Sequence, residues 1–211
     1  MSSSSSIDAH LRVLFRSTLL FGIACGISIA LSSLHLNAIG FSMGKIGYLA
    51  IFFGAGVVLS ALPAGYLIRR VSAKWTLVCS LFLYSTTVIA FPILKSFEAI
   101  AAVRFLDGIF TAGVWVGSET ILLMRAEPGR KAYLTTLYAI WLSSGYVAGP
   151  LLSMGIVYVA PMYAAFIVSG GFAIASGLFS LILLPRDEAP DQLPSAKRAE
   201  GDHAEASDSQ A

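Results

Sequence analysis

The sequence predicts an all-α integral membrane protein with six transmembrane helices, and three observations lead to this. Apolar residues make up 56% of the 211 residues, while Asp, Glu, Lys and Arg make up only 12%, about half the charged share of a soluble domain. Six apolar runs are long enough, at about 20 residues each, to cross roughly 30 Å of hydrocarbon. The alternating pattern of a membrane barrel is absent, so helices are expected, because their backbone groups satisfy one another.

The six expected spans divide the chain into three parts. They are Leu14–Leu36, Ile46–Ile68, Trp75–Leu94, Ala99–Met124, Tyr133–Val159 and Met162–Leu184. A cytoplasmic N-terminal segment at 1–13 is followed by a transmembrane domain at 14–184. Residues 185–211 form a tail rich in Asp, Glu, Ala, Ser and Pro, which we expect to be disordered and cytoplasmic. The first apolar run is longer than the about 7–15 residues of a secretory signal core, so a retained helix is expected.

Basic residues between the spans predict the orientation. Eleven of them fall on one side of the expected membrane: Arg12, Arg16, Arg69, Arg70, Lys74, Arg125, Arg130, Lys131, Arg186, Lys197 and Arg198. The other side carries only Lys45 and Lys95. Because cytoplasmic loops are enriched in Lys and Arg, both termini are expected in the cytoplasm.

Several function classes are disfavoured by the same composition. The three histidines are scattered, with His10 and His203 near the termini, so no metal-ligand or nucleophile–base set is recognisable. The Gly-x-x-x-x-Gly-Lys-Ser/Thr motif of an ATP site is absent. Cys25 and Cys79 each lie inside an apolar run and are interpreted as small core residues rather than a redox pair. We therefore expect no enzyme activity, no cofactor, no metal and no nucleic-acid partner.

The fourth span carries three ionisable residues, which are costly inside a membrane. At 100° per residue, Arg104, Asp107, Trp115 and Glu119 fall with the other polar residues of this span in one stripe about 120° wide. Arg104 and Asp107 are three residues apart and can pair. Two readings stay open: an ion pair that fixes helix packing, or a carboxylate that exchanges protons with a bound substrate. Glu119 lies about 22 Å further along, either as an interfacial residue or as part of the same pathway.

Small and polar residues inside the spans predict close helix contacts. Glycines recur four apart at Gly22 and Gly26, at Gly113 and Gly117, and at Gly145 and Gly149. This spacing gives a flat face for a neighbouring helix, which serves packing alone or also lets helices slide. Pro63, Pro92 and Pro150 are expected to kink their helices. Interhelical hydrogen bonds are expected from Ser28, Ser32 and His35 in the first span and from Ser143 and Ser144 in the fifth.

Four short motifs then resemble those of a known family. Residues 65–74 are similar to the pattern Gly-x-Leu-Ala-Asp-Arg-x-Gly-Arg-Lys, with matches at Gly65, Leu67, Arg70 and Lys74. Residues 104–108 are similar to Arg-x-x-x-Gly, and Gly145, Gly149 and Pro150 to Gly-x-x-x-Gly-Pro. Residues 127–131 resemble a basic turn of the same family. Over residues 11–186 the chain resembles the amino-terminal half of a major facilitator superfamily (MFS) transporter, of a YcaD-like bacterial branch.

The resemblance implies an MFS-type half of 3+3 helices in the bacterial cytoplasmic (inner) membrane. Such transporters have two six-helix halves with the substrate between them. The resemblance thus implies a half-size secondary transporter that moves a small solute by alternating access. It would need a second half, as a homodimer or with a separate six-helix partner. The alternative is a non-transporting binding or regulatory protein, or the product of a truncated gene.

Two departures from the family pattern affect these expectations. Arg69 stands where the family has Asp, and Ser72 where it has Gly. The resemblance gives that Asp a part in the cytoplasmic gate, which Arg69 cannot play with the same sign. Residues 151–154 lack the glycines that follow the proline motif in antiporters, so drug or proton antiport gains little support.

Overall fold

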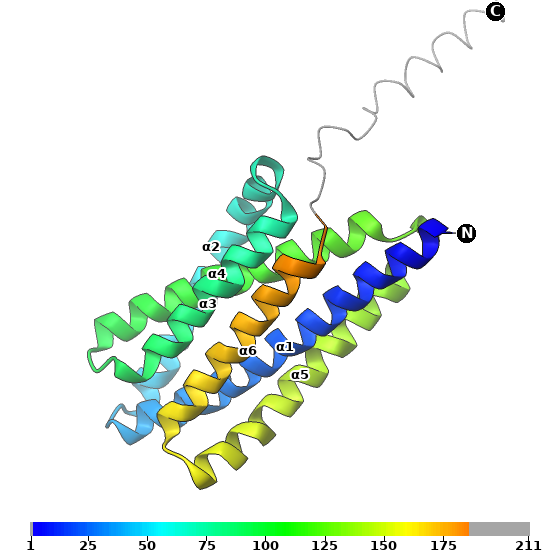
Figure 1. Ribbon diagram of the computed structural model, residues 1–211. Helices are drawn as coiled ribbons and strands as arrows, with labels where there is room; N and C mark the ends of the chain where they lie inside the picture. The colour runs from blue at the N-terminus through cyan, green and yellow to red at the C-terminus, as the bar shows by residue number, and fades with distance from the viewer. Residues whose placement is uncertain (1, 186–211) are drawn as a thin grey trace, which may run out of the picture.

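The computed structural model of the protein describes residues 2–185, which form a bundle of six long helices (Figure 1). The helices are α1 (Ser2–Ala38), α2 (Met43–Arg70), α3 (Ala73–Ala90), α4 (Phe97–Arg125), α5 (Lys131–Val159) and α6 (Met162–Leu183), with 3-10 turns η1 (Phe91–Ile93) and η2 (Pro128–Arg130). No strand occurs in the described residues. All six helices are long and apolar enough to cross a membrane, which confirms the predicted fold class. The predicted disorder of the tail concerns residues that, from 186 on, lie outside the described range.

Serine side chains define where three of the helices begin. Ser42, Ser72 and Ser96 have non-helical backbone angles, and each accepts a hydrogen bond from the amide three residues later. This arrangement satisfies one of the backbone donors left free in the first turn of a helix. The Trp75 amide donates to the Ser72 hydroxyl at 3.2 Å, and only two residues separate the end of α2 from the start of α3.

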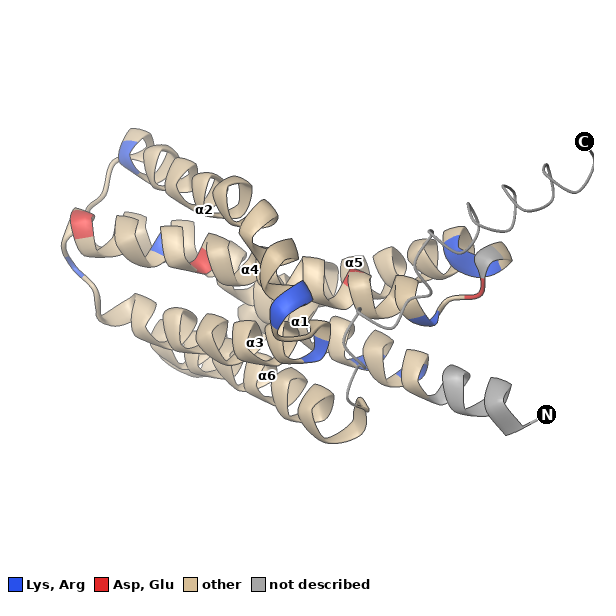
Figure 2. Ribbon diagram, turned by 90° about the horizontal axis from the view of Figure 1, so that it is seen from above, with Lys and Arg blue, Asp and Glu red and all other residues tan. Residues whose placement is uncertain are grey.

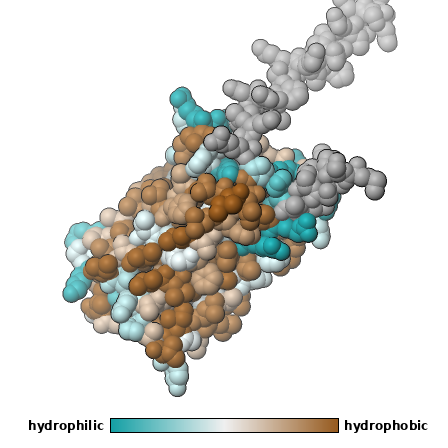
Figure 3. Space-filling view, in the orientation of Figure 1, coloured by the Kyte–Doolittle hydropathy of each residue, from teal (hydrophilic) through white to brown (hydrophobic). Residues whose placement is uncertain are grey.

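The charged residues separate to the two ends of the bundle. Eight of the eleven described Lys and Arg residues lie near the end that holds the start of α1 and the α2–α3 and α4–α5 connections (Figures 1 and 2). Lys45 and Lys95 lie at the other end, and Arg104 lies within α4 (Figure 2). In Figure 3 hydrophobic side chains cover most of the visible face between these ends. The surface therefore has the apolar belt that a bilayer requires.

The helices pack in a pattern that repeats. α1 packs against α5 and α6, α4 packs against α2 and α3, and α3 packs against α6. If α1 is exchanged with α4, α2 with α5 and α3 with α6, the same set of contacts results. The fold is thus the expected 3+3 arrangement, in which α1 and α4 correspond, as do α2 and α5.

Glycines make two close backbone crossings, and each joins a helix of one repeat to a helix of the other. A Cβ added to Gly145 of α5 would lie 2.6 Å from the carbonyl oxygen of Leu19 in α1, and one added to Gly22 would lie 2.5 Å from the oxygen of Leu142. Gly56 of α2 and Gly108 of α4 are related in the same way, through the oxygens of Phe105 and Phe53. In both crossings the clashing oxygen belongs to the residue three before the partner glycine. The backbones touch directly because neither glycine has a side chain.

The remaining small residues behave less uniformly than expected. Gly26 and Gly149 meet at the α1–α5 crossing, whereas Gly113 and Gly117 pack on Ser80 and Leu77 of α3. Pro63 and Pro150 lie inside helices, as predicted. Pro92 does not kink α3, because the α-helix has already ended at Ala90 and Pro92 lies in η1.

Serines join α1 to α6 at positions that sequence reasoning missed. The Ser17 hydroxyl lies 2.8 Å from that of Ser176 and 2.6 Å from that of Ser180. Ser169 donates to the carbonyl of Ala24 at 2.7 Å. The serines that were expected to bond between helices do otherwise: Ser32 and Ser144 donate to the carbonyls of Ser28 and Ile140 in their own helices. That prediction is therefore wrong for these two serines, because a helical serine can reach the carbonyl four residues before it.

The crossing predicts opposite effects for two glycines of α5. Gly145→Ala should destabilise the fold by about 1–3 kcal/mol, since the added methyl group overpacks the contact with α1. Gly155→Ala should be neutral or slightly stabilising, because nothing lies within 4 Å of the added Cβ and alanine favours helix. The fraction of detergent-purified protein that stays monodisperse after heating measures this. Equal midpoints for the two variants would contradict the crossing.

Candidate functional site

Helix α4 lies between neighbours that occupy different sides of it. Gly108 meets α2, Gly113 and Gly117 meet α3, and Ser118 shares a 2.8 Å hydrogen bond with Tyr138 of α5. These contacts fix which way each polar residue of α4 points.

Arg104 and Asp107 form an ion pair in the interior of the bundle. Nη1 of Arg104 lies 3.2 Å from Oδ2 of Asp107, and the two side chains are only 11% and 7% exposed. Thr87 of α3 donates to Oδ1 of Asp107 at 3.1 Å. The pair suggested by the three-residue spacing is therefore present, and it also ties α4 to α3. A buried charge is retained only when it is paired and hydrogen-bonded.

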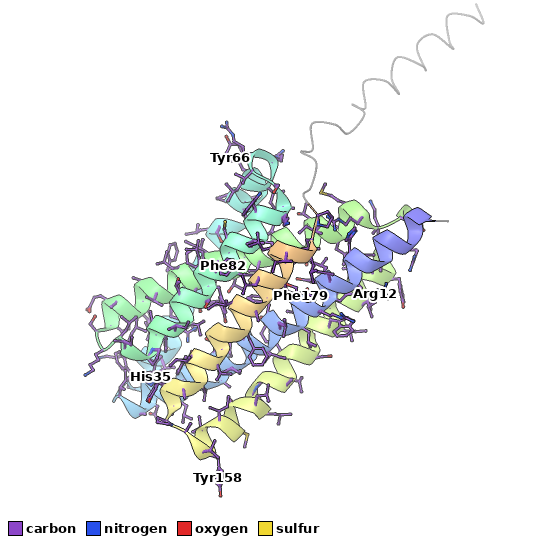
Figure 4. The ribbon with its side chains drawn as sticks, in the orientation of Figure 1. Arg12, His35, Tyr66, Phe82, Tyr158 and Phe179 are labelled. Carbon is purple, nitrogen blue, oxygen red and sulfur yellow. The ribbon has the colours of Figure 1, made fainter. Side chains whose placement is uncertain are left out.

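One aromatic ring packs on the arginine, and two further rings pack beside it. The guanidinium carbon lies 4.5 Å from the ring centroid of Phe91, a cation–π contact. Phe91 stacks on Phe166 of α6 at 5.6 Å, and His35 of α1 packs edge-on against Phe166 at 5.7 Å. His35 lies toward the end of the bundle away from Arg12 (Figure 4). Its Nε2 is buried and has no hydrogen-bond partner among the described residues.

Trp115 and Glu119 lie apart from this pair. At 100° per residue, both side chains point within about 20° of the direction of Gly108 around the helix axis. Along the axis, Glu119 is about 18 Å from Asp107. Glu119 is exposed, whereas Trp115 is partly buried and its Nε1 has no partner in the described part of the chain. Thr111 Oγ1, one turn before Trp115, is also buried without a hydrogen-bond partner among the described residues.

The stripe expected from the sequence therefore divides in two. Arg104 and Asp107 are enclosed, with Asp107 bonded to α3, while Glu119 is exposed and Trp115 lies between the directions of α2 and α5. These four residues thus form an inner ion pair and an outer tryptophan–glutamate segment, and their role in a substrate or proton pathway stays a prediction.

The residues of the loop motif have several different environments. Gly65 has open space around its Cα, and Leu67, Arg69 and Arg70 are exposed. The Arg70 guanidinium carbon lies 5.0 Å from the ring centroid of Tyr66, whose side chain projects from α2 (Figure 4).

Lys74, expected as a loop charge and as a residue of the loop motif, is buried. Its amine donates to the carbonyl of Leu184, just after α6. It therefore joins the start of α3 to the end of α6.

A further hydroxyl cluster was not anticipated. Cys25 of α1, Tyr84 of α3 and Tyr146 of α5 lie close together inside the bundle. The positions of these tyrosines along their spans do not reveal in the sequence that they meet Cys25. Cys25 is a buried core residue, as expected, but Cys79 is exposed, because an apolar run in a membrane protein faces lipid as well as core. Among the described residues no group of His, Cys, Asp and Glu is arranged to hold a metal ion.

Comparisons with known proteins agree with this architecture. A sequence profile of the Major Facilitator Superfamily matches residues 14–207. The chain is also similar to the uncharacterized MFS-type transporter YcaD of Salmonella arizonae (strain ATCC BAA-731 / CDC346-86 / RSK2980), with 23% identity over 189 residues. That match covers 88% of the chain and 49% of the relative, so the chain spans about half the length of the curated relative it matches. The chain belongs to the Major Facilitator Superfamily, as a multi-pass membrane protein of this transporter family.

Proposed function

We propose that the protein moves a small solute across the inner membrane by alternating access, with this six-helix unit as one wall of the pathway. The observation that supports this most is the exposure of α2 and α5. Only 17% of the most apolar window of each is buried, against at least 39% in each of the other helices. Two corresponding helices of the repeat thus offer surface to a second six-helix unit, either a second copy or a separate half.

Trp115 and Glu119 are proposed to face the solute. Glu119 is exposed, and the indole N–H of Trp115, which has no hydrogen-bond partner among the described residues, can donate a hydrogen bond after a small rotation. Together they offer an acceptor, a donor and an aromatic face, which suits a polar solute. Arg104 and Asp107 are proposed to lie on the same pathway, at a deeper level.

The asymmetry of the basic residues favours both termini in the cytoplasm. A single cysteine placed at Gly129 should then react with a membrane-impermeant maleimide only after the membrane is opened. One placed at Ala160 should react from outside in intact cells. The background for both is Cys79→Ser, because Cys79 is exposed. The reverse labelling pattern would overturn the proposed orientation.

Solute movement is tested in proteoliposomes with a panel of sugars, carboxylic acids, amino acids and amphiphilic cations, with and without a pH gradient. For the solute that moves, Glu119→Gln should lower the rate about 10–100-fold, the loss expected for a charged hydrogen bond. Glu127→Gln removes an acid from the loop next to η2 and should leave the rate unchanged. Equal rates for both variants would remove Glu119 from the site, and no transport by the wild type would favour a binding or regulatory protein.

The state of assembly of the transporting preparation tests the second wall. Cysteines at Val58 of α2 and Val147 of α5, both exposed, should form crosslinks to a second copy or to a separate six-helix chain. A preparation that stays monomeric and still transports at an undiminished rate would contradict this part of the proposal.

The ion pair gives a separate prediction. If Arg104 and Asp107 mainly fix packing, then Arg104→Gln and Asp107→Asn should each cost about 3–5 kcal/mol, because one buried charge is left unpaired. The double variant should then recover part of the folded yield. If Asp107 carries a coupling proton, Asp107→Asn should fold normally and lose gradient-driven transport, while equilibrium exchange survives. Normal folding and normal gradient-driven transport in all three variants would contradict both roles.

A further inference from the structure

A groove of about 420 Å³ lies between α2, α3 and α4, away from Arg104 and Glu119. Trp75, Cys79 and Leu83 of α3, all exposed, line it at intervals of four residues, or about 12 Å in total. Leu67 of α2 and Phe110 of α4 complete its apolar walls. On α2 the groove extends from Val71 to Ser60, about 16 Å, or roughly half the thickness of the hydrocarbon core.

The hydroxyl groups in this groove are largely occupied. Ser60 donates to the carbonyl of Gly56 at 2.6 Å, and Thr76 donates to that of Ser72 at 2.9 Å. A polar solute would therefore find few hydrogen bonds here. An apolar chain loses no hydrogen bonds when it enters the groove. The groove is bounded by three helices, whereas a helical partner, about 10–12 Å across, would need a broad open face.

The end of α2 and the α2–α3 connection, at the mouth of the groove, carry basic residues and no acid. No Asp or Glu occurs in residues 9–97, so α2, α3 and their connection carry Arg69, Arg70 and Lys74 without an acid. Neither arginine forms an ion pair with a described carboxylate. The N-terminus of α3 faces the same mouth, and its backbone dipole adds partial positive charge.

Arg70 and Arg69 differ in their relation to the groove. Arg70 follows the groove residue Leu67 by three positions, so the two are neighbours on the helix surface. Arg69 is two positions from both Leu67 and Val71, which also lines the groove, and it therefore points to the other side of α2. Trp75, at the mouth, is of the type found at membrane–water interfaces.

We propose that this groove binds an anionic phospholipid, with an acyl chain along Trp75, Cys79 and Leu83 and the phosphate at Arg70. Arginine suits a phosphate group because its N–H groups can bind two oxygens at once. Basic pockets between membrane helices bind anionic headgroups for the same reason. The proposal does not depend on solute transport.

Native mass spectrometry of the full chain, titrated with phosphatidylglycerol or phosphatidylcholine, tests the proposal. One phosphatidylglycerol should be retained in preference to phosphatidylcholine. Arg70→Gln should lower its occupancy about five-fold, the value of one basic group near an anionic surface, and Arg70→Lys should restore most of it. Arg69→Gln is the matched control, with the same loss of charge one residue away, and it should change occupancy less than about two-fold.

A second pair of variants tests the acyl chain. Cys79→Phe fills the groove and should reduce phosphatidylglycerol binding, whereas Thr86→Phe, on an exposed part of α3 outside the groove, should not. Leu83→Trp serves as a second filling variant if Cys79→Phe does not fold. Competition by glycerol phosphate without acyl chains would show that only the headgroup binds, and would overturn the groove assignment. Equal retention of the two lipids, or equal effects of Arg70→Gln and Arg69→Gln, would overturn the proposal as a whole.

Discussion

Direct backbone contact at two glycine crossings is the constraint on which the rest of this bundle depends. In lipid, apolar side chains gain little by leaving one hydrocarbon surface for another, so helices associate through close packing and hydrogen bonds. Gly22 with Gly145, and Gly56 with Gly108, let the carbonyl of one helix touch the Cα region of the next. Each crossing joins a central helix, α1 or α4, to a peripheral one, α5 or α2. The peripheral helices therefore keep their other sides exposed.

The central position of α4 explains why its charged residues have such different surroundings. On the side toward α3 a charge needs a partner, and Asp107 has both Arg104 and Thr87. Further along the helix, Glu119 remains exposed, so it pays no such penalty. One helix thus provides an enclosed ion pair and an open acceptor at two depths. Under the proposed function, that separation puts the buried ion pair and a solute-facing group on the same helix.

The sequence was informative about spans and local pairs, and much less so about faces. Long apolar runs located all six helices, and a spacing of three residues was enough to suggest the Arg104–Asp107 pair. Hydropathy could not tell a lipid-facing position from a core position, since both are apolar, and so Cys79 was misplaced. Partners distant in the chain were also out of reach, as for Lys74 with Leu184 and Ser17 with Ser176. The contact of Ser17 with α6 had one signal in the sequence, which is that Ser176 and Ser180 are four residues apart and so lie on the same face of the helix.

The connection between α2 and α3 shows how one substitution redirects the physical chemistry of a motif. An Asp at position 69, as in the family pattern, would neutralise part of the positive charge of the basic residues beside it. With Arg69 the segment is wholly basic, and its charge must be balanced from outside α2 and α3. A membrane rich in phosphate groups provides that balance where Arg70 and Trp75 meet the groove. Away from the α2–α3 connection, α2 is held to α4 at Gly56, and Pro63 lies between that crossing and Arg70. A phospholipid bound at Arg70 would therefore act on the portion of α2 beyond Pro63.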